Sequence, residues 1–160
     1  MTHRARFAFI LIAVGALCAC ATGQNHSKNA DARADGGRAC PDVSRWGAPQ
    51  LYGAWEVELT QLGQRGRLLL RQHPEFRESL RGEFSYGGQA SIASGDVEGG
   101  EVNLDESRDG KSLHAFWSGH LVPGACGREI RGAWQQLARE GVPAAESSFI
   151  LRRGAAPGGW

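Results

Sequence analysis

The chain has 160 residues, and its 18 Lys and Arg against 17 Asp and Glu give a formal net charge of +1. Loss of Arg4 and Arg6 with an N-terminal leader would change this charge to −1, because two positive charges would go. A near-neutral chain without a basic run lacks the electrostatic footprint of a nucleic-acid-binding protein, so no nucleic-acid partner is expected.

The first residues of the chain predict export. Arg4 and Arg6 precede an apolar run over residues 7–17, which ends in small residues and cysteines. This order is typical of a secretory signal peptide, and the run is shorter than the ~20 apolar residues that a membrane-spanning helix needs. We therefore expect residues 1–19 to be a signal peptide of the lipoprotein type.

The end of this leader, Leu17-Cys18-Ala19-Cys20, resembles the lipidation box of bacterial lipoproteins. The resemblance implies cleavage before Cys20 and acylation of Cys20, with palmitate among the attached lipids. The protein would then be attached to a membrane by this lipid anchor. Ala21 in place of Asp implies the outer membrane, on either its periplasmic or its outer side. The alternative is cleavage after Ala21, which would give a soluble secreted protein.

Composition divides the rest of the chain in two. Residues 21–39 hold no large apolar side chain, so we expect 20–39 to be a flexible tether and 40–160 to be a single domain. A mature chain that starts at Cys20 keeps two other thiols, Cys40 and Cys126. In an oxidising compartment such a pair predicts one disulfide, and the alternative is that both thiols stay free.

Alternation of apolar and polar residues dominates the domain and is typical of half-buried strands. Trp55-Glu56-Val57-Glu58-Leu59 is one example, and Ile130-Arg131-Gly132-Ala133-Trp134 fits if Gly132 faces inward. Glycine-rich turns separate such runs. The expected strands are 53–60, 66–72, 79–86, 89–97, 101–106, 112–122, 128–138 and 147–153, and only 73–78 and 139–146 leave room for a helical turn.

Eight short strands joined by tight turns favour an all-β domain. An eight-stranded antiparallel up-and-down β-barrel closes such a meander and removes its sheet edges. A two-sheet β-sandwich is the alternative.

Two short motifs at the ends of this domain carry a resemblance. Gly53-Ala54-Trp55 opens the first strand, and Arg152-Arg153 closes the last. A Gly-x-Trp followed at the far end of the domain by an arginine resembles the signature of calycins, the superfamily of lipocalins and avidins. The resemblance implies a barrel end closed by an arginine packed over Trp55. Alternation places the two arginines on opposite faces, and Arg153, in phase with Leu151, is expected to face inward.

Aromatic side chains recur at inward positions of the expected strands. Phe84, Tyr86, Trp117 and Trp134 could line a cup for a small apolar ligand. The alternative is that they fill the interior, because an eight-stranded barrel is just wide enough to be packed solid.

Polar residues give no firm metal or catalytic site. His114 and His120 share one face of an expected strand without a third ligand, and we expect both to face solvent. The Asp105–Asp109 segment lacks the ligand spacing of a calcium loop. No cofactor or metal is expected, and the absence of nucleophile-elbow, metalloprotease and P-loop motifs indicates that the protein is not an enzyme.

These observations predict a non-catalytic cell-envelope lipoprotein. Its role would be to bind a small apolar ligand or another envelope component. The alternatives are a proteinaceous inhibitor of a secreted hydrolase, such as a protease or a lysozyme, and a structural envelope subunit. An inhibitor would need a protruding loop or arm, and a ligand binder would need an open lumen.

Overall fold

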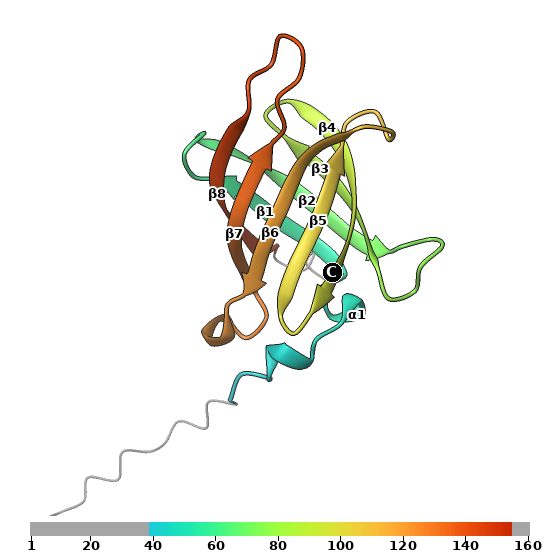
Figure 1. Cartoon of the computed structure of the whole chain (residues 1–160). Helices are drawn as coiled ribbons and strands as arrows, with labels where there is room; N and C mark the ends of the chain where they lie inside the picture. Colours follow the sequence, from blue (N-terminus) through green and yellow to red (C-terminus); the bar gives the residue numbers. More distant parts are fainter. Residues whose placement is uncertain (1–38, 155–160) are drawn as a thin grey trace, which may run out of the picture. The chain divides into compact units, whose positions relative to one another are not determined.

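Eight antiparallel strands close on themselves in the computed structural model, which describes residues 39–154 (Figure 1). Each strand pairs with the next along the chain, and the last pairs with the first. The expected up-and-down barrel is therefore confirmed, and the sandwich is excluded. The strands are β1 (Gly53–Leu59), β2 (Gln64–Gln72), β3 (Leu80–Tyr86), β4 (Gln89–Glu98), β5 (Glu101–Ser107), β6 (Leu113–Leu121), β7 (Glu129–Gln136) and β8 (Ala145–Arg153).

The helical turns lie elsewhere than the sequence predicted. They are η1 (Val43–Arg45), α1 (Ala48–Leu51) and η2 (Pro123–Ala125). The expectation that only 73–78 and 139–146 leave room for a helical turn is therefore wrong. At 73–78 the His73 ring nitrogen accepts the amides of Glu75 and Phe76, which bends the chain without a helix. At 139–146, Arg139 and Val142 pair as an antiparallel bridge.

Alternation places one side of every strand in a continuous core. On β1 the buried residues are Trp55, Val57 and Leu59, as the sequence predicted. Gly132 lies in phase with the buried Ile130 and Trp134 and stands opposite Gly119 of β6. A Cβ at Gly132 would lie 2.0 Å from the carbonyl oxygen of Ser118, so only glycine permits this close approach.

The two ends of the barrel differ. The end that carries α1 also holds the β2–β3, β4–β5 and β6–β7 connections, and here the Cys40–Cys126 disulfide is present with its Cα atoms 4.6 Å apart. We call it the α1 end. The opposite end, here called the hairpin end, carries the β1–β2, β3–β4, β5–β6 and β7–β8 connections.

The expected signal peptide (1–19), the acylated Cys20 and all but the last residue of the expected tether lie outside the described residues. Over residues 39–154, none of the helices has the length and apolar character that crossing a membrane requires.

Candidate functional site

The α1 end is sealed by Trp55. Its ring is 1% exposed, and its indole nitrogen donates a hydrogen bond of 2.9 Å to the carbonyl oxygen of Leu51. Arg153 lies with its guanidinium carbon 4.8 Å from the centre of the Trp55 ring, and it also donates to the carbonyl oxygens of Tyr52 and Gln50. This confirms the expected stacking of Arg153 on Trp55.

Arg152 and Gly53, the other two motif residues, do not contact the Trp55 ring in the way that Arg153 does. Arg152 of β8 points outward. Its guanidinium donates a hydrogen bond of 2.9 Å to Glu58 of β1 and forms an ion pair of 3.4 Å with Glu129 of β7, so it links β8 to both neighbouring strands. The hydrogen bond with Glu58 raises the pKa of Arg152, while burial lowers the pKa of Arg153. Gly53 has a φ of +123°, a conformation that side-chain-bearing residues rarely adopt. This end is a structural closure.

The four aromatic residues expected to line a ligand cup are all buried within the barrel and touch one another. Each is at most 5% exposed. The rings of Phe84 and Trp117 stack with centroids 4.5 Å apart, and Tyr86 meets both edge-on. The Trp134 ring lies 6.3 Å from that of Trp117 and 6.5 Å from that of Tyr86. The four rings form a single packed cluster.

A carboxylate that the sequence analysis did not single out sits against this cluster. Glu106 is 1% exposed, and its oxygens accept the hydroxyl of Tyr86 at 2.8 and 2.9 Å and that of Ser91 at 2.5 Å. The indole nitrogens of Trp117 and Trp134 donate to it at 2.8 and 3.4 Å. We call these five residues the Glu106 centre.

The signal for Glu106 was present in the sequence. On β5 the buried residues are Val102, Leu104 and Glu106, so the same alternation that predicts the core places Glu106 inward. Burial raises the pKa of Tyr86 far above its usual range, and the negative charge of Glu106 adds to the effect, so the phenol stays a donor. The Glu106 centre is a buried carboxylate satisfied entirely by neutral donors.

His114 is buried, so the expectation that it faces solvent together with His120 is wrong. His120 is exposed, but His114 is only 4% exposed and lies 6.5 Å from the Trp134 ring, centre to centre. The register shifts here: Ala115 pairs with Glu106 and Leu113 with Ser107, so His114 is an extra residue in β6. Such a bulge breaks the two-residue phase. Burial lowers the pKa of His114, and the positive charge of Arg108 lowers it further.

Asp109 organises the β5–β6 turn. One carboxylate oxygen accepts the amides of Lys111 at 2.8 Å and Ser112 at 2.7 Å, and the hydroxyl of Ser107 at 3.0 Å. These hydrogen bonds hold the pKa of Asp109 well below its usual range. In the part of the chain that the structure describes, no three His, Cys, Asp or Glu side chains come together as a metal site.

The β7–β8 connection, residues 137–144, projects beyond the rim of the hairpin end (Figure 1), and we call it the apical hairpin. Arg139 and Val142 exchange backbone hydrogen bonds of 2.8 and 2.9 Å across it. The side chain of Gln136 donates to the carbonyl of Pro143 at 3.0 Å, and the Arg139 guanidinium donates to the carbonyl of Leu113. These bonds fix the shape of the hairpin.

Apolar side chains are exposed on and beside this hairpin. Leu137 is 36% and Val142 45% exposed, and Leu62 on the neighbouring β1–β2 turn is 39% exposed. The Leu62 turn is held to β8 because Gln61 exchanges hydrogen bonds with Ser147 and accepts the amide of Ser148. The hairpin end thus presents three apolar side chains on backbone that is fixed by hydrogen bonds.

No protein-family model matches this chain, and no curated protein or solved structure matches it either.

Proposed function

We propose that this protein is a non-catalytic, lipid-anchored module of the cell envelope that binds another envelope protein through its hairpin end. The observation that carries the proposal is the apical hairpin, which combines a fixed backbone with exposed Leu137 and Val142. Binding to a surface whose shape is already fixed loses little conformational entropy, and exposed apolar side chains supply the area to be buried.

The packed interior favours an outer surface over the lumen as the binding site. A small apolar ligand in the lumen would have to displace rings such as Trp117, which donates to Glu106. A buried carboxylate that loses donors is strongly destabilised, so such an exchange is unfavourable. Three of the four rings that would line a cup, those of Tyr86, Trp117 and Trp134, are needed to satisfy Glu106.

The position of the proposed lipid anchor is compatible with binding through the hairpin end. Acylation of Cys20 would attach the chain to the outer membrane, and Cys40 joins the barrel at the α1 end through its disulfide with Cys126. The apical hairpin lies at the opposite end of the barrel. Replacement Cys20→Ser is expected to move the protein from the membrane to the soluble fraction, and unchanged fractionation would contradict the anchor.

A second function is favoured by the shape of the hairpin. The Arg139–Val142 bridge makes a narrow, two-stranded tip, which is the kind of protrusion that enters the cleft of a hydrolase. An inhibitor of a secreted protease or lysozyme would use the same residues as a binding module. The two functions differ in whether a purified hydrolase loses activity when the protein is added.

The binding proposal is tested by crosslinking in intact cells. A photo-crosslinking amino acid at position 142 is expected to give an adduct of defined mass, and the same amino acid at position 76 is the control. Phe76 is 59% exposed but lies on the β2–β3 connection at the α1 end. The adduct should disappear when Leu137→Ser is added. Equal adducts from both positions, or one that survives Leu137→Ser, would contradict the proposal.

The inhibitor function is tested by titrating the purified protein into a lysozyme, a serine protease and a metalloprotease. Loss of activity in one of them that Val142→Asp abolishes, and that Phe76→Asp leaves intact, would support inhibition. Both substitutions replace exposed side chains, so both variants should remain folded.

A further inference from the structure

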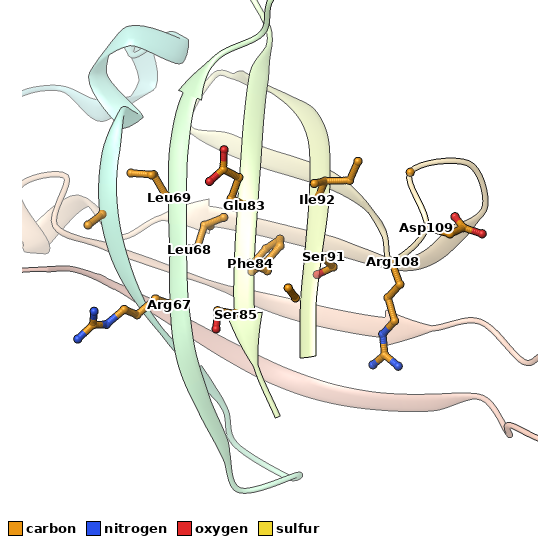
Figure 2. Close-up of a pocket in the computed structure, with 13 residues that line it drawn as sticks. Arg67, Leu68, Leu69, Glu83, Phe84, Ser85, Ser91, Ile92, Arg108 and Asp109 are labelled. Carbon is orange, nitrogen blue, oxygen red and sulfur yellow. The ribbon is translucent and has the colours of Figure 1, made fainter. Parts of the chain in front are cut away.

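A groove of about 720 Å³ crosses the outer face of the barrel over β2, β3 and β4 (Figure 2). Leu68, Phe84 and Ser91 of these strands point inward and are buried, so their neighbours along each strand point outward. The β5–β6 turn borders one side of the groove. The side chains that matter for the argument are those of Arg67, Leu69, Ser85, Ile92 and Arg108.

The outward side chains fall into two rows because of the strand register. Leu69 stands beside Glu83, which stands beside Ile92, and Ala54 of β1 extends this row. The second outward row is formed by Arg67, Ser85 and Ala90. It lies two residues further along each strand, which is ~7 Å from the first row. Figure 2 shows Leu69, Glu83 and Ile92 at one level and Arg67 and Ser85 at the next, with the guanidinium of Arg108 extending to the latter side.

The first row is mainly apolar, and Glu83 is its charged member. Leu69 and Ile92 are half-buried, and a Cβ at Gly110 of the β5–β6 turn would lie 3.4 Å from the Ile92 side chain. Glu83 is paired with Arg71 at 3.7 Å. The carboxylate of Asp109 is occupied by its own turn. This row offers aliphatic contact to a ligand.

The second row carries positive charge and a hydroxyl. Among residues 39–154, neither Arg67 nor Arg108 forms an ion pair, and the Ser85 hydroxyl makes no hydrogen bond. Glu56 stands opposite Arg67 on β1, but the two charged groups lie beyond 4.0 Å. Arg67 and Arg108 lie on either side of Ser85, and Figure 2 shows the Arg67 guanidinium extending away from it. Both arginines are exposed and, within the described residues, form no ion pair, so their side chains can turn towards Ser85, where guanidinium groups are donors suited to a carboxylate or a phosphate.

We propose that the outer groove binds a single-chain amphiphile with an anionic head group. The head lies on Ser85 between Arg67 and Arg108, and the aliphatic chain follows the first row from Ile92 across the methylene groups of Glu83 to Leu69 and Ala54. The volume of the groove is in the range of small-molecule sites, and its two rows match the two halves of such a ligand. This site is separate from the apical hairpin, so it does not depend on the proposed protein partner.

The test uses the full chain carrying Cys20→Ser, which removes the proposed acylation site and allows purification without detergent. Dodecanoate, below its micelle concentration, is titrated by calorimetry and by amide NMR. Shifts are expected at residues of β2–β4 and the β5–β6 turn. Acetate, with the head alone, and dodecyltrimethylammonium, with a cationic head on the same chain length, are expected to bind at least about tenfold more weakly.

Variants of the groove test which residues contact the head group and which contact the aliphatic chain. The pair Arg67→Gln with Arg108→Gln should weaken dodecanoate binding about tenfold or more, and Ile92→Ser should weaken it independently of head charge. The control is Arg77→Gln, an exposed arginine of the β2–β3 connection outside the groove. All these positions are exposed or half-buried, and a thermal melt shows whether each variant is folded.

Three results would overturn the proposal. One is equal dodecanoate binding by the double variant and by Arg77→Gln. Another is equal binding of the anionic and cationic amphiphiles, which would show general apolar adsorption. The third is a set of NMR shifts centred on the apical hairpin or the barrel interior. A failure of hairpin crosslinking would leave all three measurements unaffected, so the two proposals fail separately.

Discussion

Replacement of Glu106 tests whether its buried hydrogen bonds hold the barrel interior together. In Glu106→Leu the donors of Tyr86, Ser91 and Trp117, now at 2.5–2.9 Å from the carboxylate, lose their acceptor while staying buried. An unsatisfied buried donor costs about 1–3 kcal/mol, so three would cost about 3–9 kcal/mol. Burying a carboxylate carries its own desolvation penalty of several kcal/mol, which the substitution removes.

We therefore expect Glu106→Leu to lower the free energy of unfolding by about 3–5 kcal/mol, a large share of the about 5–15 kcal/mol that such a domain possesses. Glu106→Gln keeps one acceptor oxygen of similar shape and is expected to lose about 1–3 kcal/mol. The measurement is urea unfolding at pH 7 with the disulfide oxidised, read from the midpoint and slope of the transition.

The matched control is Glu101→Gln, at an exposed position on the same strand, which should change stability by less than about 0.5 kcal/mol. Two results would refute the reasoning. A Glu106→Leu variant within 1 kcal/mol of the parent would show that the carboxylate costs as much as its donors gain. Equal losses for Leu and Gln would show that the acceptor oxygen is not what matters.

The remaining predictions concern the α1 end, the disulfide and the bulge. Trp55→Ala should lower the free energy of unfolding by about 3–5 kcal/mol in the same urea assay, because a fully buried ring is lost. Replacement of Cys40 and Cys126 by Ser should cost about 2–5 kcal/mol, and reduction of the parent protein should give the same midpoint. The pKa of His114 is lower in the folded state than in the unfolded chain, so as the pH falls through ~6.5 the unfolded chain binds a proton at His114 before the folded protein does. The free energy of unfolding should therefore have its full value above that pH and decline below it. His114→Gln should reduce the decline between pH 7 and 5, whereas the exposed His120→Gln should not; equal declines in both variants would contradict this.

The fold was predictable because strand alternation is a local signal. Residues 55–59 show the two-residue period directly, and the same period fixes which residues enter the core. Arg153 stacks on Trp55, and Arg152 does not, because Arg153 is two residues after the buried Leu151 and so lies on the same face of β8. Strand ends agreed with the expected positions to within about two residues, with β8 starting at Ala145 and not at 147.

The parts that were missed depend on contacts between segments far apart in the chain. The bulge at His114 adds one residue to β6, and nothing in the local sequence marks where the phase is reset. Glu106 was in phase to face inward, but a single acidic residue in an apolar stripe does not reveal its donors. Those donors come from β3, β4, β6 and β7 and meet only when the barrel closes.

Closure of the barrel also explains why the outer surface is the better place to look for function. Tyr86, Trp117 and Trp134 donate to Glu106 and Phe84 stacks on Trp117, so opening the lumen would break hydrogen bonds as well as packing contacts. At the α1 end, Trp55 and Arg153 are similarly occupied with the backbone of residues 50–52. Within residues 39–154, the buried side-chain atoms that lack a hydrogen-bond partner are His114 Nε2 and Arg153 Nε. On the outside, the exposed side chains of the apical hairpin and the two arginines of the outer groove are available to a partner. Because the aromatic rings pack on one another and Glu106 is hydrogen-bonded inside the barrel, substitutions there should change stability, whereas substitutions at these two surfaces should change binding.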